Sequence, residues 1–67
     1  MNIVQTWTCA SDEADIIVAE LVLSDKSTVY NVYSFNDAHY HLLVHAFNKS
    51  HAIECAEKIV AACLAAA

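Results

Sequence analysis

The sequence predicts an α+β fold, in which a small antiparallel sheet of about four strands forms a meander and one C-terminal helix packs on one of its faces. Three observations predict it. Apolar residues recur at helical spacing near the end of the chain, the earlier segments are rich in β-branched and aromatic residues, and short runs of Asn, Asp and Ser separate them. The 67 residues contain no linker and no repeat, so we expect a single compact domain over 1–67.

The first two strands are predicted over 3–8 and about 15–23. Strict alternation places Ile3 and Trp7 on one face of the first strand, opposite Val4 and Thr6. Residues 11–24 fit two assignments, because their acidic start resembles the first turn of a helix, which would give a βαββα order. We prefer a strand, since 16–18 is a β-branched run and the charged residues of this segment do not gather on one helical face.

The next two strands are predicted as a hairpin over 28–35 and 39–47. Both segments are rich in Val, Tyr, Phe and Leu, and a short Asn36-Asp37 connection joins them. With strict alternation, the face of the second strand that points at the helix carries Tyr40, Leu42, Val44 and Ala46. The opposite face carries His39, His41 and His45.

The final helix is predicted over about 50–65. Its apolar residues recur at helical spacing, as Ile53, Ala56, Val60, Cys63 and Leu64. Alanine supplies helix propensity, and Ser50 or Asn48 is expected to cap the first turn. One helix covers one face of the sheet, so the other face needs a different cover.

Composition excludes several classes of site. The chain contains no glycine and no proline, so a glycine-rich phosphate loop, a dinucleotide fingerprint and a nucleophile elbow are all ruled out. It has eight carboxylates, three lysines and no arginine, for a formal charge of −5, and we expect no direct contact with nucleic acid. The apolar run 59–67 falls far short of the roughly 20 residues that cross a bilayer, and no signal peptide is indicated, so we expect no membrane contact and a cytoplasmic location.

Catalysis has little support in the sequence. No spacing places a nucleophile beside a base, and the three cysteines, Cys9, Cys55 and Cys63, follow no metal-type spacing. We therefore expect reduced thiols, no enzyme activity and no cofactor.

A metal-binding module is the alternative from another class. Residues two apart on a strand are about 6.6 Å apart, so His39 and His41 could chelate one ion together with Asp37. His45 lies about 13 Å beyond His41 and cannot join that site. A histidine stripe that faces solvent or an interface is the plainer interpretation, and an interface whose stability depends on pH is a third one.

An apolar surface is left to explain. Hydrophobic residues make up 58% of the chain, above the roughly 45–50% of ordinary domains, and the second strand is apolar on both faces. We expect the uncovered face to carry Ile16, Val18 and Val22, and to bind a second copy or another protein. The rim of that surface is predicted to be acidic, through Asp12, Glu13, Asp15 and Asp25. Tyr33 and Phe35 are candidate contact residues if their face points outward.

In size and charge the chain resembles the small inhibitors and adaptors that phages and mobile elements encode, anti-CRISPR proteins among them. The resemblance implies stoichiometric binding to a host protein, with carboxylates meeting a basic groove that otherwise holds nucleic acid. The sequence thus predicts a non-enzymatic acidic interaction protein, expected to form a homodimer or to bind a basic nucleic-acid-binding protein in the host cytoplasm. A small structural subunit of a larger assembly would need the same apolar surface.

Overall fold

The computed structural model describes residues 1–9 and 14–66, and for Cys9 and 64–66 it describes the backbone alone. The elements are β1 (Asn2–Cys9), β2 (Ala14–Val22), β3 (Thr28–Asn36), β4 (His39–Ala46) and α1 (Lys49–Ala66). The predicted α+β fold is confirmed, and the ambiguous second segment is a strand from Ala14 onward. Asp12 and Glu13 lie outside the described residues.

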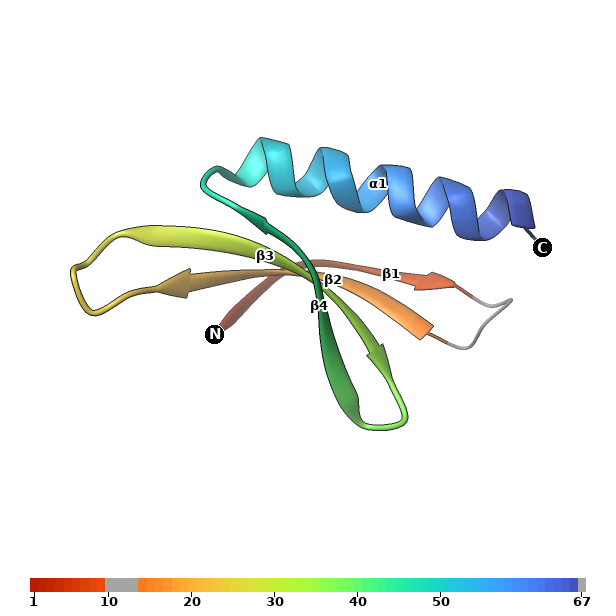
Figure 1. Cartoon of the computed structure of the whole chain (residues 1–67), viewed down its shortest axis with the longest axis horizontal. Helices are drawn as coiled ribbons and strands as arrows, with labels where there is room; N and C mark the ends of the chain where they lie inside the picture. The colour runs from red at the N-terminus through yellow and green to blue at the C-terminus, as the bar shows by residue number, and fades with distance from the viewer. Residues whose placement is uncertain (10–13, 67) are drawn as a thin grey trace.

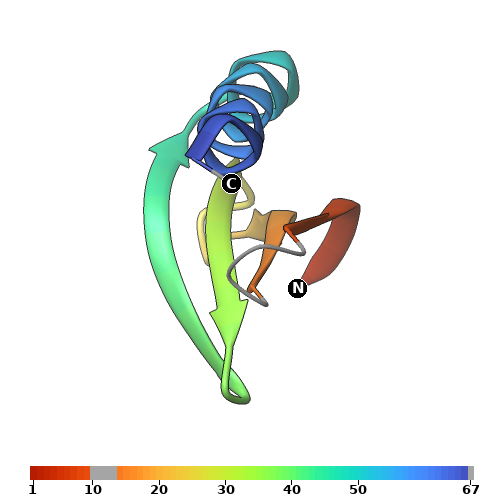
Figure 2. The same cartoon turned by 90° about the vertical axis from the view of Figure 1, so that its right-hand side faces the viewer.

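The four strands form an antiparallel sheet in the order β1-β2-β3-β4, which is the predicted meander. Helix α1 lies along one face of this sheet (Figure 1). The sheet is strongly twisted, and the β3–β4 hairpin extends away from α1, as Figures 1 and 2 both show. The opposite face, which we call the open face, is not covered by α1.

The core lies between α1 and the sheet. Its buried residues are Ile16, Val18, Val32, Ala46, Ala52 and Ala56. Among the described residues, the largest fully buried side chains are those of Val18 and Val32, and the first half of α1 contributes Ala52 and Ala56. Such small residues let α1 lie close to the sheet, but they bury little apolar area for a chain of this length.

Each edge strand contains a β-bulge that interrupts the alternation of faces. In β1, Ile3 pairs with Ala19 and Gln5 pairs with its neighbour Val18, so Val4 is the extra residue. Ile3 and Trp7, predicted to share a face, therefore lie on opposite faces of the sheet: Ile3 on the open face and Trp7 packed against the core.

The bulge in β4 lies at Leu43. Leu42 pairs with Tyr33, and Val44 pairs with the adjacent Val32. The predicted common face of β4 is therefore wrong, because Val44 and Ala46 point at α1 while Tyr40 and Leu42 lie on the open face. For the same reason the histidines do not form one stripe. His45 is on the open face, and His39 and His41 are on the other.

Residues other than glycine adopt left-handed backbone conformations at the turns. Asp37 (φ 52°) and Ala38 (φ 61°) form the two-residue connection between β3 and β4, one position later than predicted. Lys26, in the β2–β3 turn, also has a left-handed backbone conformation (φ 70°). Glycine normally takes such positions, so its absence leaves local strain in these turns.

The helix begins directly after Asn48, which caps it. Its Oδ1 accepts the His51 backbone N–H at 2.7 Å and the Ser50 hydroxyl at 3.1 Å, so of the two predicted caps it is Asn48 that serves. Within the described residues, no helix combines the length and the apolar character needed to cross a membrane.

Candidate interaction surface

The register of the four strands defines the open face. Its strand positions are Ile3, Thr6, Thr8, Asp15, Ile17, Ala19, Leu21, Val29, Asn31, Tyr33, Phe35, Tyr40, Leu42 and His45. Those near the middle of the sheet are already buried by their neighbours on adjacent strands, with Ile17 4% and Val29 3% exposed. On β4 and just after it the side chains are exposed: Tyr40 47%, Leu42 58% and Phe47 77%. The apolar surface that lacks a cover is therefore concentrated along β4.

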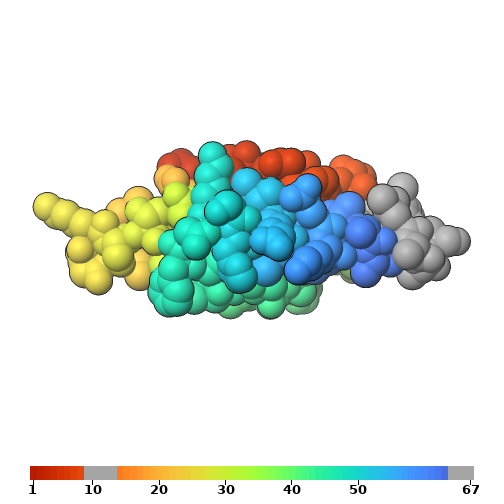
Figure 3. Space-filling view, turned by 90° about the horizontal axis from the view of Figure 1, so that it is seen from above, coloured from red at the N-terminus to blue at the C-terminus, as the bar shows by residue number. Residues whose placement is uncertain are grey.

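The contact residues predicted on β2 do not lie on the open face. Ile16 and Val18 are buried beneath α1, so the prediction that they lie on the uncovered face is wrong. Val22 is 66% exposed. Val22 is the last residue of β2, next to the β2–β3 turn, and this hairpin projects beyond the N-terminal end of α1 (Figure 3).

Three aromatic rings pack together on the open face. The Tyr40 ring meets that of Tyr33 edge-on, with centroids 5.8 Å apart, and meets Phe35 at 4.7 Å. Tyr33 and Phe35, named as candidate contacts from the sequence, are half-buried in this cluster. The outer ring, Tyr40, is the one most available to a partner.

A polar chain crosses the open face beside these rings. Asn31 is the buried polar residue of the described part of the chain, and its Nδ2 donates to the Tyr33 hydroxyl at 3.0 Å. Its Oδ1 lies 2.7 Å from His45 Nδ1, which must then carry the proton and donate. The His45 ring packs edge-on against Phe47, with centroids 5.1 Å apart. These contacts fix the positions of Tyr33, His45 and Phe47 relative to one another.

Charges are sparse on this surface. Among the described strand positions, Asp15 is the one carboxylate on the open face, where it pairs with Thr8 and Phe35 at one end of the sheet. The predicted rim residue Asp25 lies in the β2–β3 turn, where Ser27 donates to it through its hydroxyl and its backbone N–H. These two bonds, the hydroxyl bond first, lower the pKa of Asp25 below its ordinary 3.8. Asp12 and Glu13, the remainder of the rim, lie outside the described residues.

One carboxylate lies on the helix side of the sheet. Glu20 Oε2 accepts a hydrogen bond from the Tyr30 hydroxyl at 3.2 Å. Desolvation and this bond raise the pKa of Tyr30. Glu20 is thus part of the helix side and not of the open face.

The described part of the chain contains no metal-binding cluster at the alternative site, which was expected at Asp37, His39 and His41. His39 and His41 are both exposed on the β3–β4 hairpin, where they pair with Asn36 and Ser34. No group of three or more His, Cys, Asp or Glu residues able to hold a metal occurs within residues 1–9 and 14–66. Asp37, the third ligand expected from the sequence, therefore does not complete a metal site with this pair.

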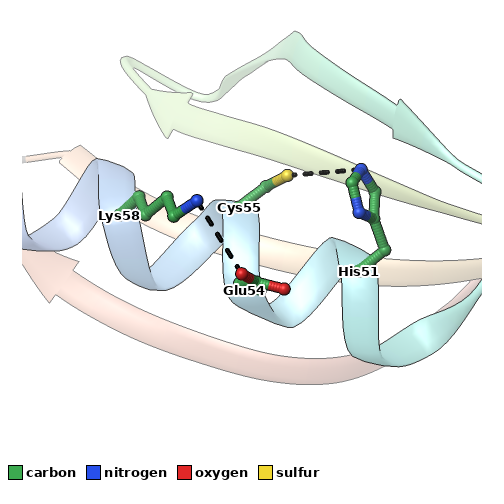
Figure 4. A network of polar contacts seen from close by, with 4 residues as sticks. All are labelled: His51, Glu54, Cys55 and Lys58. Atoms are coloured by element: carbon green, nitrogen blue, oxygen red, sulfur yellow. Dashed lines mark hydrogen bonds and ion pairs between the residues drawn. The ribbon is translucent and has the colours of Figure 1, made fainter.

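Sequence reasoning missed a pair on the helix. His51 Nε2 lies 3.7 Å from Cys55 Sγ, and beside them Lys58 Nζ pairs with Glu54 Oε1 at 3.7 Å (Figure 4). The signal that could have found the first pair is the spacing i, i+4, which brings two side chains to adjacent turns of one helix face.

The chain matches no family model, and neither a curated protein nor a solved structure is significantly similar to it.

Proposed function

We propose that this protein is a non-enzymatic interaction protein and that the open face along β4 is its contact surface. The observation that carries the proposal is the exposure of Leu42 and Phe47, 58% and 77%, beside a fixed aromatic and polar framework. Large apolar side chains held in place in this way lose little conformational entropy when a partner buries them. The partner we propose is a second copy of the chain, in a face-to-face homodimer.

Charge favours a second copy over a basic partner on this surface. Two copies meeting through β4 would bring together mainly neutral side chains, because Asp15, the one carboxylate among the described strand positions of the open face, lies on β2 and is separated from Tyr40 by β3. The open face therefore offers few carboxylates to a basic groove on another protein. Binding to a basic nucleic-acid-handling protein, the function of an anti-CRISPR-like inhibitor, would instead have to use carboxylates away from the open face.

Area and edge geometry also favour this arrangement. A stable dimer buries about 800 Å² per partner, roughly a fifth of the 4369 Å² that this chain exposes. An interface of that size needs a face of the sheet and not the edge of one strand. Association edge to edge is less favourable, because bulges at Val4 and Leu43 interrupt both edge strands.

Sedimentation equilibrium of three proteins tests the proposal. The wild type should be dimeric and Leu42→Asp monomeric with an unchanged circular dichroism spectrum, because the new carboxylate would be buried in the interface. Val22→Asp is the matched control. Val22 is 66% exposed and pairs with Thr28 on the helix side of the sheet, not on the open face, so this variant should remain dimeric.

Two results would overturn the proposal: a wild type that is monomeric at every concentration, or equal association of Leu42→Asp and wild type. Should Leu42→Asp fail to fold, Phe47→Ser replaces it, because a side chain that is 77% exposed contributes little to the monomer. The salt dependence of association distinguishes a second copy of the chain from a basic protein partner. High salt should leave an apolar dimer intact, whereas binding of acidic side chains to a basic protein would weaken.

A further inference from the structure

The His51–Cys55 pair on α1 has the geometry of two ligands of one metal ion. The two residues lie on adjacent turns, and His51 Nε2 is 3.7 Å from Cys55 Sγ (Figure 4). With metal–sulfur and metal–nitrogen bonds of about 2.3 and 2.05 Å, a tetrahedral zinc site places these two atoms about 3.6 Å apart. An ion could therefore bind between them with almost no movement of either side chain.

We propose that His51 and Cys55 form a two-ligand site for a thiophilic divalent ion such as Zn²⁺. Imidazole nitrogen and thiolate sulfur are the ligands that zinc prefers, and both belong to the same helix, whose first turn Asn48 fixes. The partly exposed thiol and exposed imidazole leave room for water or an added ligand at the other two positions. The formal charge of −5 favours the approach of a cation.

Within the part of the chain that the structure describes, no third His, Cys, Asp or Glu joins this pair in a group able to hold a metal. The Glu54 carboxylate is the nearest acidic candidate in sequence, but it pairs with Lys58. The pair His39 and His41, the site considered from sequence alone, lies on the β3–β4 hairpin, and the proposal assigns the ion to α1 instead. The site is independent of the open face and of the homodimer.

Alkylation of the wild-type protein, followed by peptide mass analysis, tests this site directly. The free thiolate is the nucleophile, so bound Zn²⁺ should slow alkylation of Cys55 about tenfold. The slowing should disappear in His51→Ala, which removes one ligand and leaves every thiol in place. The matched control is the double substitution His39→Ala and His41→Ala, which should retain the full protection.

A second measurement reports the ligands themselves. Cobalt(II), used as a spectroscopic substitute for zinc, should give a sulfur-to-metal charge-transfer band with wild type, and Cys55→Ser should lose it. The proposal is overturned if Cys55 protection survives in His51→Ala, if it is lost in the His39/His41 double variant, or if the band persists in Cys55→Ser.

Discussion

Leu42 and Val44 are two positions apart on β4, yet they lie on opposite faces of the sheet. They pair with consecutive residues of β3, Tyr33 and Val32, because Leu43 is an extra residue between them. The bulge lets β4 do two things along its length. Its end closes the core beneath α1 through Val44 and Ala46, and its beginning places Tyr40 and Leu42 on the open face.

Val18 is predicted to be a core residue and not a contact residue. It is fully buried, so Val18→Ala should lower the free energy of unfolding by about 2 kcal/mol through lost burial and a residual cavity. Val22→Ala, at a position 66% exposed, is the control and should change it by less than about 0.5 kcal/mol. Chemical denaturation measures both, and equal effects would contradict the burial of Val18 in the core.

Asn31 is predicted to hold the framework of the open face together. Asn31→Ala leaves the Tyr33 hydroxyl and His45 Nδ1 without their partner, which should cost about 1–3 kcal/mol of stability. Tyr33→Phe removes one of the two bonds and leaves the Nδ2 donor of Asn31, a residue 8% exposed, without its acceptor, so it should also cost about 1–3 kcal/mol. Thermal or chemical unfolding measures both variants, and either variant unfolding like the wild type would show that the bonds it removes do not stabilise the fold.

Ala38 is predicted to be a site where glycine is stabilising. Its φ of 61° is unfavourable for a residue with a Cβ, so Ala38→Gly should raise stability by about 1 kcal/mol. The same substitution at Ala61, exposed within α1, should lower stability by about 1 kcal/mol. Opposite signs in denaturant unfolding are the expected result; a loss at both positions would reject a strained turn.

The Asp25 carboxyl is predicted to make stability depend on pH in the acidic range. Its pKa is lowered in the folded state by the Ser27 hydroxyl and backbone bonds, so the folded chain holds the carboxylate form more strongly than the unfolded chain does. The stabilisation is complete above the ordinary value of 3.8 and is lost as pH falls through the lower folded value. In Ser27→Ala, carbon-detected NMR titration should show the Asp25 midpoint moving up toward 3.8; an unmoved midpoint would exclude the hydroxyl as the main cause.

The strands, their order and the final helix could be predicted because local chemistry specifies them. β-Branched and aromatic runs favour strands, short polar segments favour antiparallel turns, and Asn48 precedes an alanine-rich helical pattern. The faces could not be predicted in the same way. A bulge needs one extra residue and leaves no clear mark on composition, so strict alternation misplaced the side chains of β1 and β4.

The face of β2 that α1 covers could not be predicted for a different reason. This strand is apolar on both sides, with Ile16 and Val18 on one and Ile17 and Ala19 on the other, so its pattern does not say which side receives a helix. The position at which the chain leaves β4 and begins α1 determines which face of β2 the helix covers. Ala46, the last residue of β4, is buried on the side of Val18 and Val32, and α1 begins three residues later.

The most direct test of the proposed homodimer is an isotope-filtered NMR experiment on an equimolar mixture of labelled and unlabelled wild-type chains. We predict intermolecular contacts that involve the side chains of Tyr40, Leu42 and Phe47, with none to the exposed side of α1. A dimer whose intermolecular contacts fall on α1, or a mixture that shows none at millimolar concentration, would contradict the assignment of the open face as the contact surface.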